Sequence, residues 1–513
     1  NTGDPLLETW QIAWIGHALL HAPLDLWQAN TFWPLRDTLA FSDALVGYAP
    51  AALLAQASPQ AALAVYNLLF IGVYALAFVG AYLLGRELGL AVPGAAAAGV
   101  AYAYAPWKLA QNHHLHVLSS GGIALALFLL VRGYRRRSPW LVLAGWMVAS
   151  WQMTLGFTLG LQLTYVVLVL AAGAGVLVLR GALPRPDRRV VVTTVAGAVL
   201  FVSVSGLMAR PYLRVLDAHP EIEQERTPAY VESFSPRLRS FLSAPAQSWL
   251  WGDVTHRARA PLPAPDEMAL FPGLTIGVLA LVGALGGVFP RRLRIGLVVA
   301  VAVFALLSLG VRDVSGLDRY ATPYRLLYDF APGWVGIRTP GRINVLTSLG
   351  LALLAGAGLC VVVRHLGSRG RVRAATAVGA LAVAAILVEG LGPLEHPRAP
   401  QPPRAVLLAD PPHLHLPTTF QSVYMYWSTA GFPATVNGFG AFDPVDSMRL
   451  REEVTGFPDR RSVTALRALG VRSVLLHVDQ VAGTASEDAA TKPIAGLWLD
   501  RDVIDDVIVF RLR

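Results

Sequence analysis

The sequence predicts a polytopic, all-α transmembrane protein with amphipathic helices at its outer face and a small extracytoplasmic α/β domain at its C-terminal end. Of the 513 residues, 54% are hydrophobic and only 15% are charged, and the mean hydropathy is +0.50. These values are too apolar for a soluble chain of this length. In addition, roughly ten apolar stretches are each about long enough to cross a bilayer, and arginine-rich loops follow every second stretch.

The apolar stretches predict about ten membrane spans, at 60–84, 91–106, 117–132, 139–155, 158–180, 190–207, 268–288, 295–310, 342–364 and 374–393. Clustered arginines occupy four short connections, at 132–137, 180–189, 291–294 and 364–373. By the positive-inside rule these connections are cytoplasmic. The longer segments between the spans are therefore expected on the opposite, outer side.

This topology divides the chain into three predicted parts. Residues 1–58 form a first extracytoplasmic loop with two interfacial helices, because apolar residues recur at helical spacing over 3–21 and again over 44–56. Residues 59–393 form a transmembrane domain with extracytoplasmic loops at 207–267 and 311–341. Residues 394–513 form an extracytoplasmic α/β domain, since a proline-rich stretch up to Pro412 is followed by a helical stretch at 462–469 and by β-like runs at 473–478 and 503–510.

The start of the chain is unusual for such a topology. Loop parity places Asn1 outside the membrane, yet about 58 residues precede the first predicted span. We expect a further transmembrane helix before Asn1; a cleaved secretory signal is the alternative. Both possibilities give the same orientation of the later spans.

Composition and motifs restrict the function. The net charge of +9 comes mostly from the short arginine loops, so membrane topology and anionic lipid explain it better than nucleic acid does. The single cysteine, Cys360, excludes a disulfide within the chain and a cysteine metal cluster. We find no P-loop, GxGxxG or GxSxG in a fitting strand-to-helix context, which makes ATP-driven transport by this chain alone unexpected.

Acids, amides and aromatic residues gather in the first outer loop. Asp4 precedes Pro5 at the expected helix start, so it is either an N-cap or a functional acid. The other candidates for a catalytic or substrate-binding role in this loop are Glu8, Trp10, Trp27, Gln28, Asn30 and Asp43. Such a surface suits a polar head group at the bilayer edge. An ordinary aromatic belt explains the tryptophans but not the acids and amides together.

Further candidates lie in other outer segments. Arg338 and Arg342, four residues apart before a span, can grip a phosphate on one helical face or contact lipid phosphates by snorkelling. Lys108 is another candidate phosphate partner, and Glu232 is a reserve acid. His113 and His116 have a spacing that suits a divalent metal only on a helix and with acidic partners; polar residues at a helix end are the alternative.

Several segments resemble the GT-C superfamily of bacterial membrane glycosyltransferases, including YfhO-like and related membrane proteins. The matching pieces cover most of the chain: Gly3-Asp4-Pro5 with Trp10, the stretch 26–34, Phe41-Ser42-Asp43, the stretch 104–116 with its histidines, the stretch 332–342, Val436-Asn437-Gly438-Phe439 and Leu469-Gly470-Val471-Arg472. The span that should precede Asp4 in this family is absent from the sequence.

The resemblance implies an enzyme of the bacterial cytoplasmic (inner) membrane. GT-C proteins use polyprenyl-phosphate-linked sugars as donors and act on the outer side, with an essential acid in the first outer loop, and that acid maps to Asp4. The implied partners are the lipid-linked donor, membrane lipids and a glycan, lipid or protein acceptor. Inversion at the anomeric carbon and a divalent cation, Mg or Mn, are further expectations.

Two other functions fit the same topology. A lipid-linked glycan transporter or flippase would need polar groups along its spans, and the predicted spans contain few. A non-catalytic membrane scaffold with a partner-binding tail leaves the acids, histidines and tryptophans of the outer segments unexplained. The sequence therefore favours the glycosyltransferase, with Asp4, Glu8 and Asp43 as candidate catalytic acids.

Overall fold

The computed structural model describes residues 3–311, 322–393 and 397–513. Part of the predicted loop 311–341 and the predicted domain start at 394 lie outside these residues. The described residues form two compact units. The bundle unit comprises 70–208 and 223–393, apart from the gap, and the terminal unit comprises 3–69, 209–222 and 397–513.

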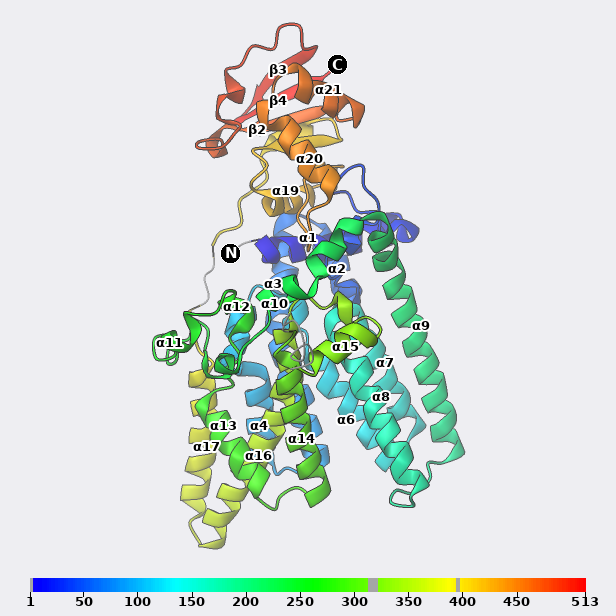
Figure 1. Cartoon of the computed structure of the whole chain (residues 1–513), viewed down its shortest axis with the longest axis vertical. Helices are drawn as coiled ribbons and strands as arrows, with labels where there is room; N and C mark the ends of the chain where they lie inside the picture. The colour runs from blue at the N-terminus through cyan, green and yellow to red at the C-terminus, as the bar shows by residue number, and fades with distance from the viewer. Residues whose placement is uncertain (1–2, 312–321, 394–396) are drawn as a thin grey trace. The chain divides into compact units, whose positions relative to one another are not determined.

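The bundle unit is built from long apolar helices (Figure 1). Each of the ten predicted spans coincides with one of them: α3 (Pro59–Leu88), α4 (Val92–Tyr104), α6 (Gly121–Arg135), α7 (Pro139–Leu155), α8 (Phe157–Leu179), α9 (Arg188–Ala218), α13 (Leu274–Leu285), α14 (Arg291–Ser308), α16 (Asn344–Ser368) and α17 (Val372–Glu389). Within the described residues, six helices are long and apolar enough to cross a membrane, and α13 is a shorter apolar helix. The chain is therefore a multi-pass membrane protein.

Helix α16 forms the centre of the bundle. It is the most buried of the candidate spans, and it packs against α4, α13 and α14. Its contact with α13 is close because both helices carry a glycine there: a Cβ at Gly358 would overlap the Leu279 carbonyl, and one at Gly283 would overlap the Leu354 carbonyl. Small residues at such contacts let helix backbones approach each other in a membrane.

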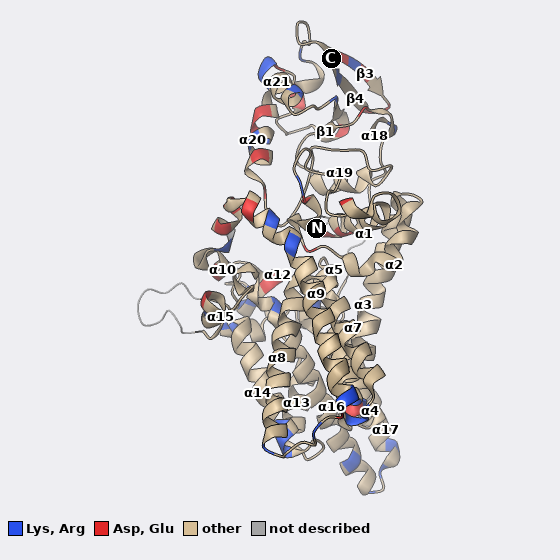
Figure 2. Cartoon of the chain, turned by 90° about the vertical axis from the view of Figure 1, so that its right-hand side faces the viewer, with Lys and Arg blue, Asp and Glu red and all other residues tan. Residues whose placement is uncertain are grey.

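The two ends of the bundle differ in charge and in the length of their connections. Figure 2 shows basic residues gathered at the lower end of the bundle helices, and the turns after α6 and α16 carry the arginines of 132–137 and 364–373. Arg132 Nη1 lies 3.0 Å from Glu87 Oε2 at that end. The other end carries short helices: η5 (Pro106–Gln111), α5 (Leu115–Leu118), α10 (Pro228–Ser233), η7 (Leu238–Leu242), α11 (His256–Arg259), α12 (Pro265–Met268), α15 (Tyr324–Phe330), η9 (Trp334–Gly336) and η10 (Pro340–Ile343).

The terminal unit contains a four-stranded mixed sheet with the strand order β1-β2-β4-β3. Strands β1 (His413–Leu416) and β2 (Ser473–His477) are parallel, with Leu414 opposite Val474. Strands β3 (Leu499–Ile504) and β4 (Val507–Leu512) complete the sheet in antiparallel pairs. The helices of the tail are α18 (Arg404–Leu408), α19 (Gln421–Ser428), α20 (Val445–Glu453) and α21 (Arg460–Ala468), with the 3-10 turns η11 (Val454–Gly456), η12 (Val478–Gln480) and η13 (Glu487–Ala490).

The N-terminal helix α1 (Gly3–His21) belongs to the same unit and contacts α19 of the tail. It also contacts α2 (Ala49–Ala52) and η4 (Leu53–Gln56). Unlike an amphipathic helix with a polar outer side, α1 buries all residues from Leu6 to Ile15. A helix that is covered on every side needs apolar residues all round. Most buried residues of α1 are apolar, and the buried polar side chains of Thr9 and Gln11 form hydrogen bonds.

The second stretch expected to form an interfacial helix, 44–56, consists of three short pieces. These are η3 (Val46–Tyr48), α2 and η4. Pro50 occupies an early position of α2, where its missing amide hydrogen costs no hydrogen bond within the helix. The three pieces follow one another directly along the chain, and η4 ends at Gln56 before α3 begins.

Three buried histidines lie on the parallel strands β1 and β2 of the sheet. His413 and His415 are on β1 and His477 ends β2, and all three side chains are buried. His415 Nδ1 lies 2.9 Å from His477 Nε2, and the His415 ring stacks on Tyr424 with centroids 4.7 Å apart. Burial lowers the pKa of His413 and of His477 to about 4 and holds the pKa of His415 well below its usual value. The histidines are therefore neutral in the folded protein.

This cluster predicts that the sheet loses stability in mild acid. As the pH falls from 6.5 towards 4, protons bind these histidines in the unfolded chain but not in the folded one. Each depressed group then removes about 1.4 kcal/mol of folding free energy per pH unit. Hydrogen exchange of β1 and β2, corrected for its intrinsic pH dependence, should speed up between pH 7 and pH 5 in the whole protein. His413→Leu should reduce this change; an identical pH response in that variant would contradict the prediction.

Candidate functional site

The acids of the first loop converge on one face of α1. Asp4, Glu8 and Gln11 are spaced so that they share a helical face. Gln11 Nε2 donates to the Asp43 carbonyl over 3.1 Å, which places the Asp43 main chain beside that face. Glu8 is only 3% exposed, whereas Asp4 and Asp43 are half-buried. A ligand can therefore reach Asp4 and Asp43 more easily than Glu8.

Asp4 lies within the first turn of α1 rather than before it, because the helix begins at Gly3. A carboxylate in the first turn faces the positive end of the helix dipole, which stabilises its charged form. Thr9 donates to the Pro5 carbonyl over 2.7 Å in the following turn. The Asp4 carboxylate can therefore stabilise the start of α1 and also take part in chemistry.

Trp10 and Asn30 form a structural pair beneath this face. The Trp10 indole donates from Nε1 to Asn30 Oδ1 over 3.0 Å, and Asn30 Nδ2 donates to the Pro433 carbonyl over 2.8 Å. Trp10 is 1% exposed, so it can affect a ligand only through its neighbours. The Asn30 amide thereby links the first loop to the tail within the terminal unit.

Residues of α9 fix the rest of the loop. The Tyr212 hydroxyl donates to the Ser42 carbonyl over 3.1 Å and accepts from the Ala44 amide over 2.8 Å, so it holds the chain on both sides of Asp43. Arg214 Nη2 lies 2.7 Å from Asp37 Oδ1. The loop therefore presents Asp43 from a backbone that is tied to α9.

Gln28 and Trp27 lie on the outer side of the same loop. Gln28 Nε2 donates to Asp37 Oδ1 over 2.9 Å, and the Asp37 amide donates back to Gln28 Oε1 over 3.1 Å. The half-buried Trp27 ring meets Tyr212 edge-on, with centroids 6.0 Å apart. Of the two, Gln28 is exposed and offers an amide to a ligand.

A second charged cluster lies in the bundle unit, on segments that are distant in sequence. Arg342 of η10 binds Glu267 of α12 in a bidentate manner: Nη2 lies 2.6 Å from Oε1 and Nε lies 3.3 Å from Oε2. Arg342 Nη1 lies 3.0 Å from His116 Nε2. Gln111 Nε2 donates to the Asp266 carbonyl over 3.0 Å. The cluster thus joins η5, α5, α12 and η10.

The charges in this cluster are well defined. Burial raises the pKa of the Glu267 carboxyl, but Arg342 and His114 lower it more, to about 2. Burial, together with the Arg342 charge, lowers the pKa of His114 to about 3. A guanidinium has no acceptor, so Nε2 of His116 accepts from Arg342 and the ring proton lies on Nδ1. Glu267 and Arg342 are therefore an ion pair, and the His114 imidazole beside it is neutral.

Arg338 and Glu232 lie in the same unit. Arg338 comes before η10, so it does not share one helical face with Arg342 as the spacing predicted. Its guanidinium carbon lies 5.7 Å from the centre of the Phe234 ring. Glu232 is an exposed residue of α10. Substrate binding by Arg338 and by Glu232 stays a prediction.

Lys108 is buried, at 2% exposure. Its Nζ lies 3.3 Å from Ser120 Oγ and 4.7 Å from the centre of the Tyr102 ring. Burial lowers the pKa of Lys108 to about 7, so a modest change of pH or of environment alters its charge. A phosphate can contact this amine only if neighbouring groups move.

The residues around His116 do not fit a divalent cation. Nε2, the atom that would bind a metal, is already 3.0 Å from the Arg342 guanidinium, and a positive guanidinium repels a metal ion. No group of three or more histidine, cysteine or acidic residues with metal-site geometry occurs among the described residues. Metal binding by His113 and His116 stays a prediction.

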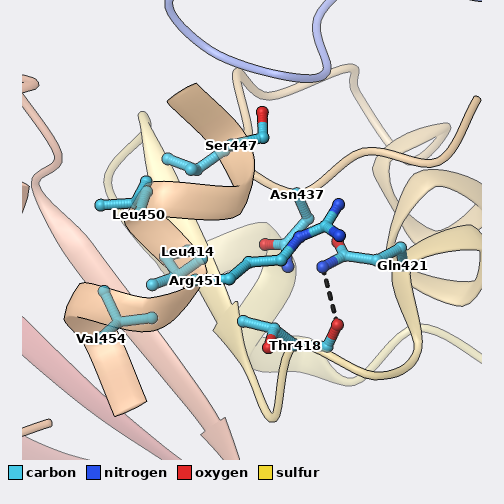
Figure 3. Close-up of a pocket in the computed structure, with 9 residues that line it drawn as sticks. Leu414, Thr418, Gln421, Asn437, Ser447, Leu450, Arg451 and Val454 are labelled. Carbon is cyan, nitrogen blue, oxygen red and sulfur yellow. Dashed lines mark hydrogen bonds between the residues drawn. The ribbon is translucent and has the colours of Figure 1, made fainter. Parts of the chain in front are cut away.

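The tail has one small pocket, shown in Figure 3, between β1 and α20. Arg451 and Gln421 line it, and Gln421 Nε2 donates to the Thr418 carbonyl over 2.7 Å. Its cavity volume of about 10 Å³ accommodates roughly one water molecule. The pocket is too small for a sugar.

Sequence reasoning missed Glu267, Tyr212 and Arg214. Glu267 is the last residue of the predicted outer loop 207–267. That loop contains several acids, and their charge alone does not show which of them forms a buried ion pair. Tyr212 and Arg214 follow the predicted span at 190–207, because α9 continues to Ala218. The amphipathic pattern of that extension is the signal that could have shown a longer helix.

Comparison with known proteins places the fold. No family model matches the chain, and no curated protein matches it. Among solved structures, the arabinofuranosyltransferase AftD from Mycobacteria is similar, with a TM-score of 0.53 and 14% identity over 99% of this chain and 39% of AftD. The chain therefore shares its fold with AftD.

The oligosaccharyltransferase AglB from Archaeoglobus fulgidus is also similar, in its apo form, with a TM-score of 0.49 and 14% identity over 97% of this chain and 69% of AglB. Its complex with an inhibitory peptide and a dolichol-phosphate gives a TM-score of 0.47 at 14% identity, over 93% of this chain and 66% of that one. The chain therefore spans only part of the length of AftD and AglB.

Proposed function

We propose that the protein is an integral-membrane glycosyltransferase that moves a sugar from a polyprenyl-phosphate-linked donor to an extracytoplasmic acceptor. The observation that carries this proposal is the accessible pair of acids, Asp4 and Asp43, on a fold that resembles AftD over 99% of the chain. We further propose that the arginine-rich end of the bundle faces the cytoplasm of a bacterial inner membrane. The first loop and the tail then face outward.

In the proposed reaction, Asp4 acts as the general base. Its carboxylate takes the proton of an acceptor hydroxyl while the hydroxyl oxygen forms a bond to the anomeric carbon. The bond between that carbon and the phosphate oxygen breaks, and polyprenyl phosphate leaves with the electron pair. A single displacement of this kind inverts the anomeric configuration. Asp43 is the alternative base because it is also half-buried, whereas the burial of Glu8 favours a supporting role.

Within the bundle unit, we propose Arg342 as a partner for a phosphate group, with Arg338 and Lys108 as further candidates. Arginine matches phosphate geometry and stays charged at any physiological pH. The Glu267 carboxylate fixes the Arg342 guanidinium on two atoms, so little conformational entropy remains to be lost on binding. On the acceptor and sugar side, Gln28 is the exposed candidate, and Trp27 offers a half-buried ring.

The proposed reaction uses no metal at His116, because His116 Nε2 contacts the Arg342 guanidinium. Removal of divalent ions by a chelator, followed by addition of Mg or Mn, tests whether the reaction requires a cation. Activity that is lost and then restored would indicate a cation bound by residues other than His116.

Reconstituted protein tests the proposed function. We expect release of polyprenyl phosphate from at least one member of a panel of polyprenyl-phosphate sugars when glycan, lipid and protein acceptors are supplied. The product should have the anomeric configuration opposite to that of the donor. No turnover with any donor and acceptor would favour a lipid-linked glycan transporter or a scaffold, and a product that retains the donor configuration would refute the single displacement.

A further inference from the structure

Two histidines lie one turn apart at the C-terminal end of α1. His17 and His21 are four residues apart within the helix, so they lie on the same helical face. Their ring centroids are 4.5 Å apart. The two histidines of H-E-x-x-H zinc sites have this same spacing on a helix. We call His17 and His21 the histidine pair.

The His21 ring has the tautomer that a metal ligand needs. Its Nδ1 lies 2.9 Å from the His17 carbonyl oxygen, and a carbonyl oxygen can only accept a hydrogen bond, so the ring proton is on Nδ1. The lone pair on Nε2 can therefore bind a metal ion. Histidine ligands in proteins almost always donate their other ring nitrogen in this way, which fixes the tautomer and the orientation of the ring. His21 is exposed, so an ion can reach it from solvent.

Aromatic rings of the terminal unit hold His17 in place. The His17 ring stacks on Phe432 with centroids 4.3 Å apart, and its centroid lies 5.5 Å from that of Trp14. Burial, together with the neighbouring His21, lowers the pKa of the half-buried His17. The His17 imidazole is thus neutral at pH 7, as a metal ligand must be. Because both side chains are already ordered, little conformational entropy is lost when an ion binds.

The end of α1 also suits a positive ion. The last carbonyl groups give the C-terminal end of a helix a partial negative charge, and His21 is in the last turn of α1. The exposed acid Asp25 follows in η1 (Pro23–Asp25). Two imidazoles that bind one zinc ion at about 2.0–2.1 Å have centroids roughly 4.5–5.5 Å apart. The observed separation of 4.5 Å therefore leaves only side-chain rotation to complete the site.

We propose that the histidine pair binds one transition-metal ion of the zinc class, with water molecules in the remaining positions. Water is assigned to these positions because no third histidine, cysteine or acid with metal-site geometry occurs in the part of the chain that the structure describes. Imidazole suits zinc, copper and nickel, whereas magnesium and manganese favour oxygen ligands. Asp4 lies near the other end of α1, about 20 Å away. This inference therefore does not depend on the proposed enzymatic activity.

Zinc titration tests the histidine pair in the whole protein. The protein, purified without a histidine tag and stripped of metal, is titrated with zinc chloride in competition with a zinc-sensitive dye. We expect one Zn²⁺ per chain. His17→Gln and His21→Gln should each weaken binding by about tenfold or more, since loss of even an outer partner of a metal ligand has an effect of this size. His256→Gln is the matched control, because His256 is an exposed histidine of α11, and it should bind zinc as the wild type does.

Electron paramagnetic resonance with one equivalent of Cu²⁺ identifies the ligands directly. We expect coupling to two imidazole nitrogens in the wild type and to one in either variant of the histidine pair. Thermal unfolding without metal shows that the variants are folded, and added zinc should raise the Tm of the wild type but not of the variants. Zinc affinity that is equal in the wild type and both variants would overturn the proposal. Absence of zinc binding, or two-nitrogen coupling that persists in His17→Gln, would also overturn it.

Discussion

Asp4→Asn is expected to lower the rate of polyprenyl-phosphate release by about 10²- to 10⁴-fold, the usual effect of losing a general base. Asparagine has nearly the same shape as aspartate but cannot accept the acceptor proton. Helix α1 should still form, because residues from Leu6 to Ile15 pack it into the terminal unit independently of Asp4. Donor affinity, measured without turnover, should therefore stay close to that of the wild type.

Asp25→Asn is the matched control for this experiment. Asp25 is an exposed acid of the same loop, and its replacement should leave the rate unchanged. Wild-type turnover in Asp4→Asn would show that Asp4 is not the base. Loss of turnover in Asp43→Asn alone would then assign the role to Asp43, which is held beside α1 by Gln11 and between the two Tyr212 hydrogen bonds.

Arg342→Ala is expected to destabilise the bundle unit by about 3–5 kcal/mol, because it leaves the Glu267 carboxylate largely buried without its ion-pair partner. The side chains of Arg342 and Glu267 are only 11% and 14% exposed. Denaturant unfolding in detergent measures this loss. The double variant Arg342→Ala with Glu267→Gln should regain part of it, since the neutral amide removes the uncompensated charge.

The comparison with Arg338→Ala separates stability from substrate binding. Arg338 is half-buried and contacts the Phe234 ring, so its removal should cost little stability. If Arg342 also binds the donor phosphate, Arg342→Ala raises KM for the donor more than Arg338→Ala does. Equal stability losses in the two single variants, or no recovery in the double variant, would contradict the proposed role of the Glu267 and Arg342 pair.

The length of the apolar stretches allowed the membrane helices to be predicted from the sequence. The predicted span 139–155 has the same bounds as α7, and 60–84 lies within α3. Proline and arginine mark the start and end of several of these helices. By contrast, periodicity along α1 did not reveal its burial, because the residues that cover it come from the tail and from α2. Contacts between distant segments leave no local pattern in a single sequence.

The candidate site was predictable only in part for the same reason. The acids of the first loop and the histidines near 113–116 are close together in the sequence, so they could be grouped before the structure was known. The partner of Arg342, however, is 75 positions away, and Gln11 reaches Asp43 across 32 positions. An arginine that binds a phosphate and an arginine that pairs with a carboxylate look the same in a single sequence. Only the structure shows that Arg342 pairs with Glu267.

The contact between α1 and α19 also has a consequence for biosynthesis. The ribosome makes α19 roughly 400 residues after α1, which corresponds to about 20–80 s at ordinary elongation rates. During that interval the apolar sides of α1 lack the partner that covers them in the finished protein. The nascent chain must therefore keep α1 at the membrane surface or on a chaperone until the last quarter of the protein has emerged, and a truncated product would expose this helix to aggregation or proteolysis.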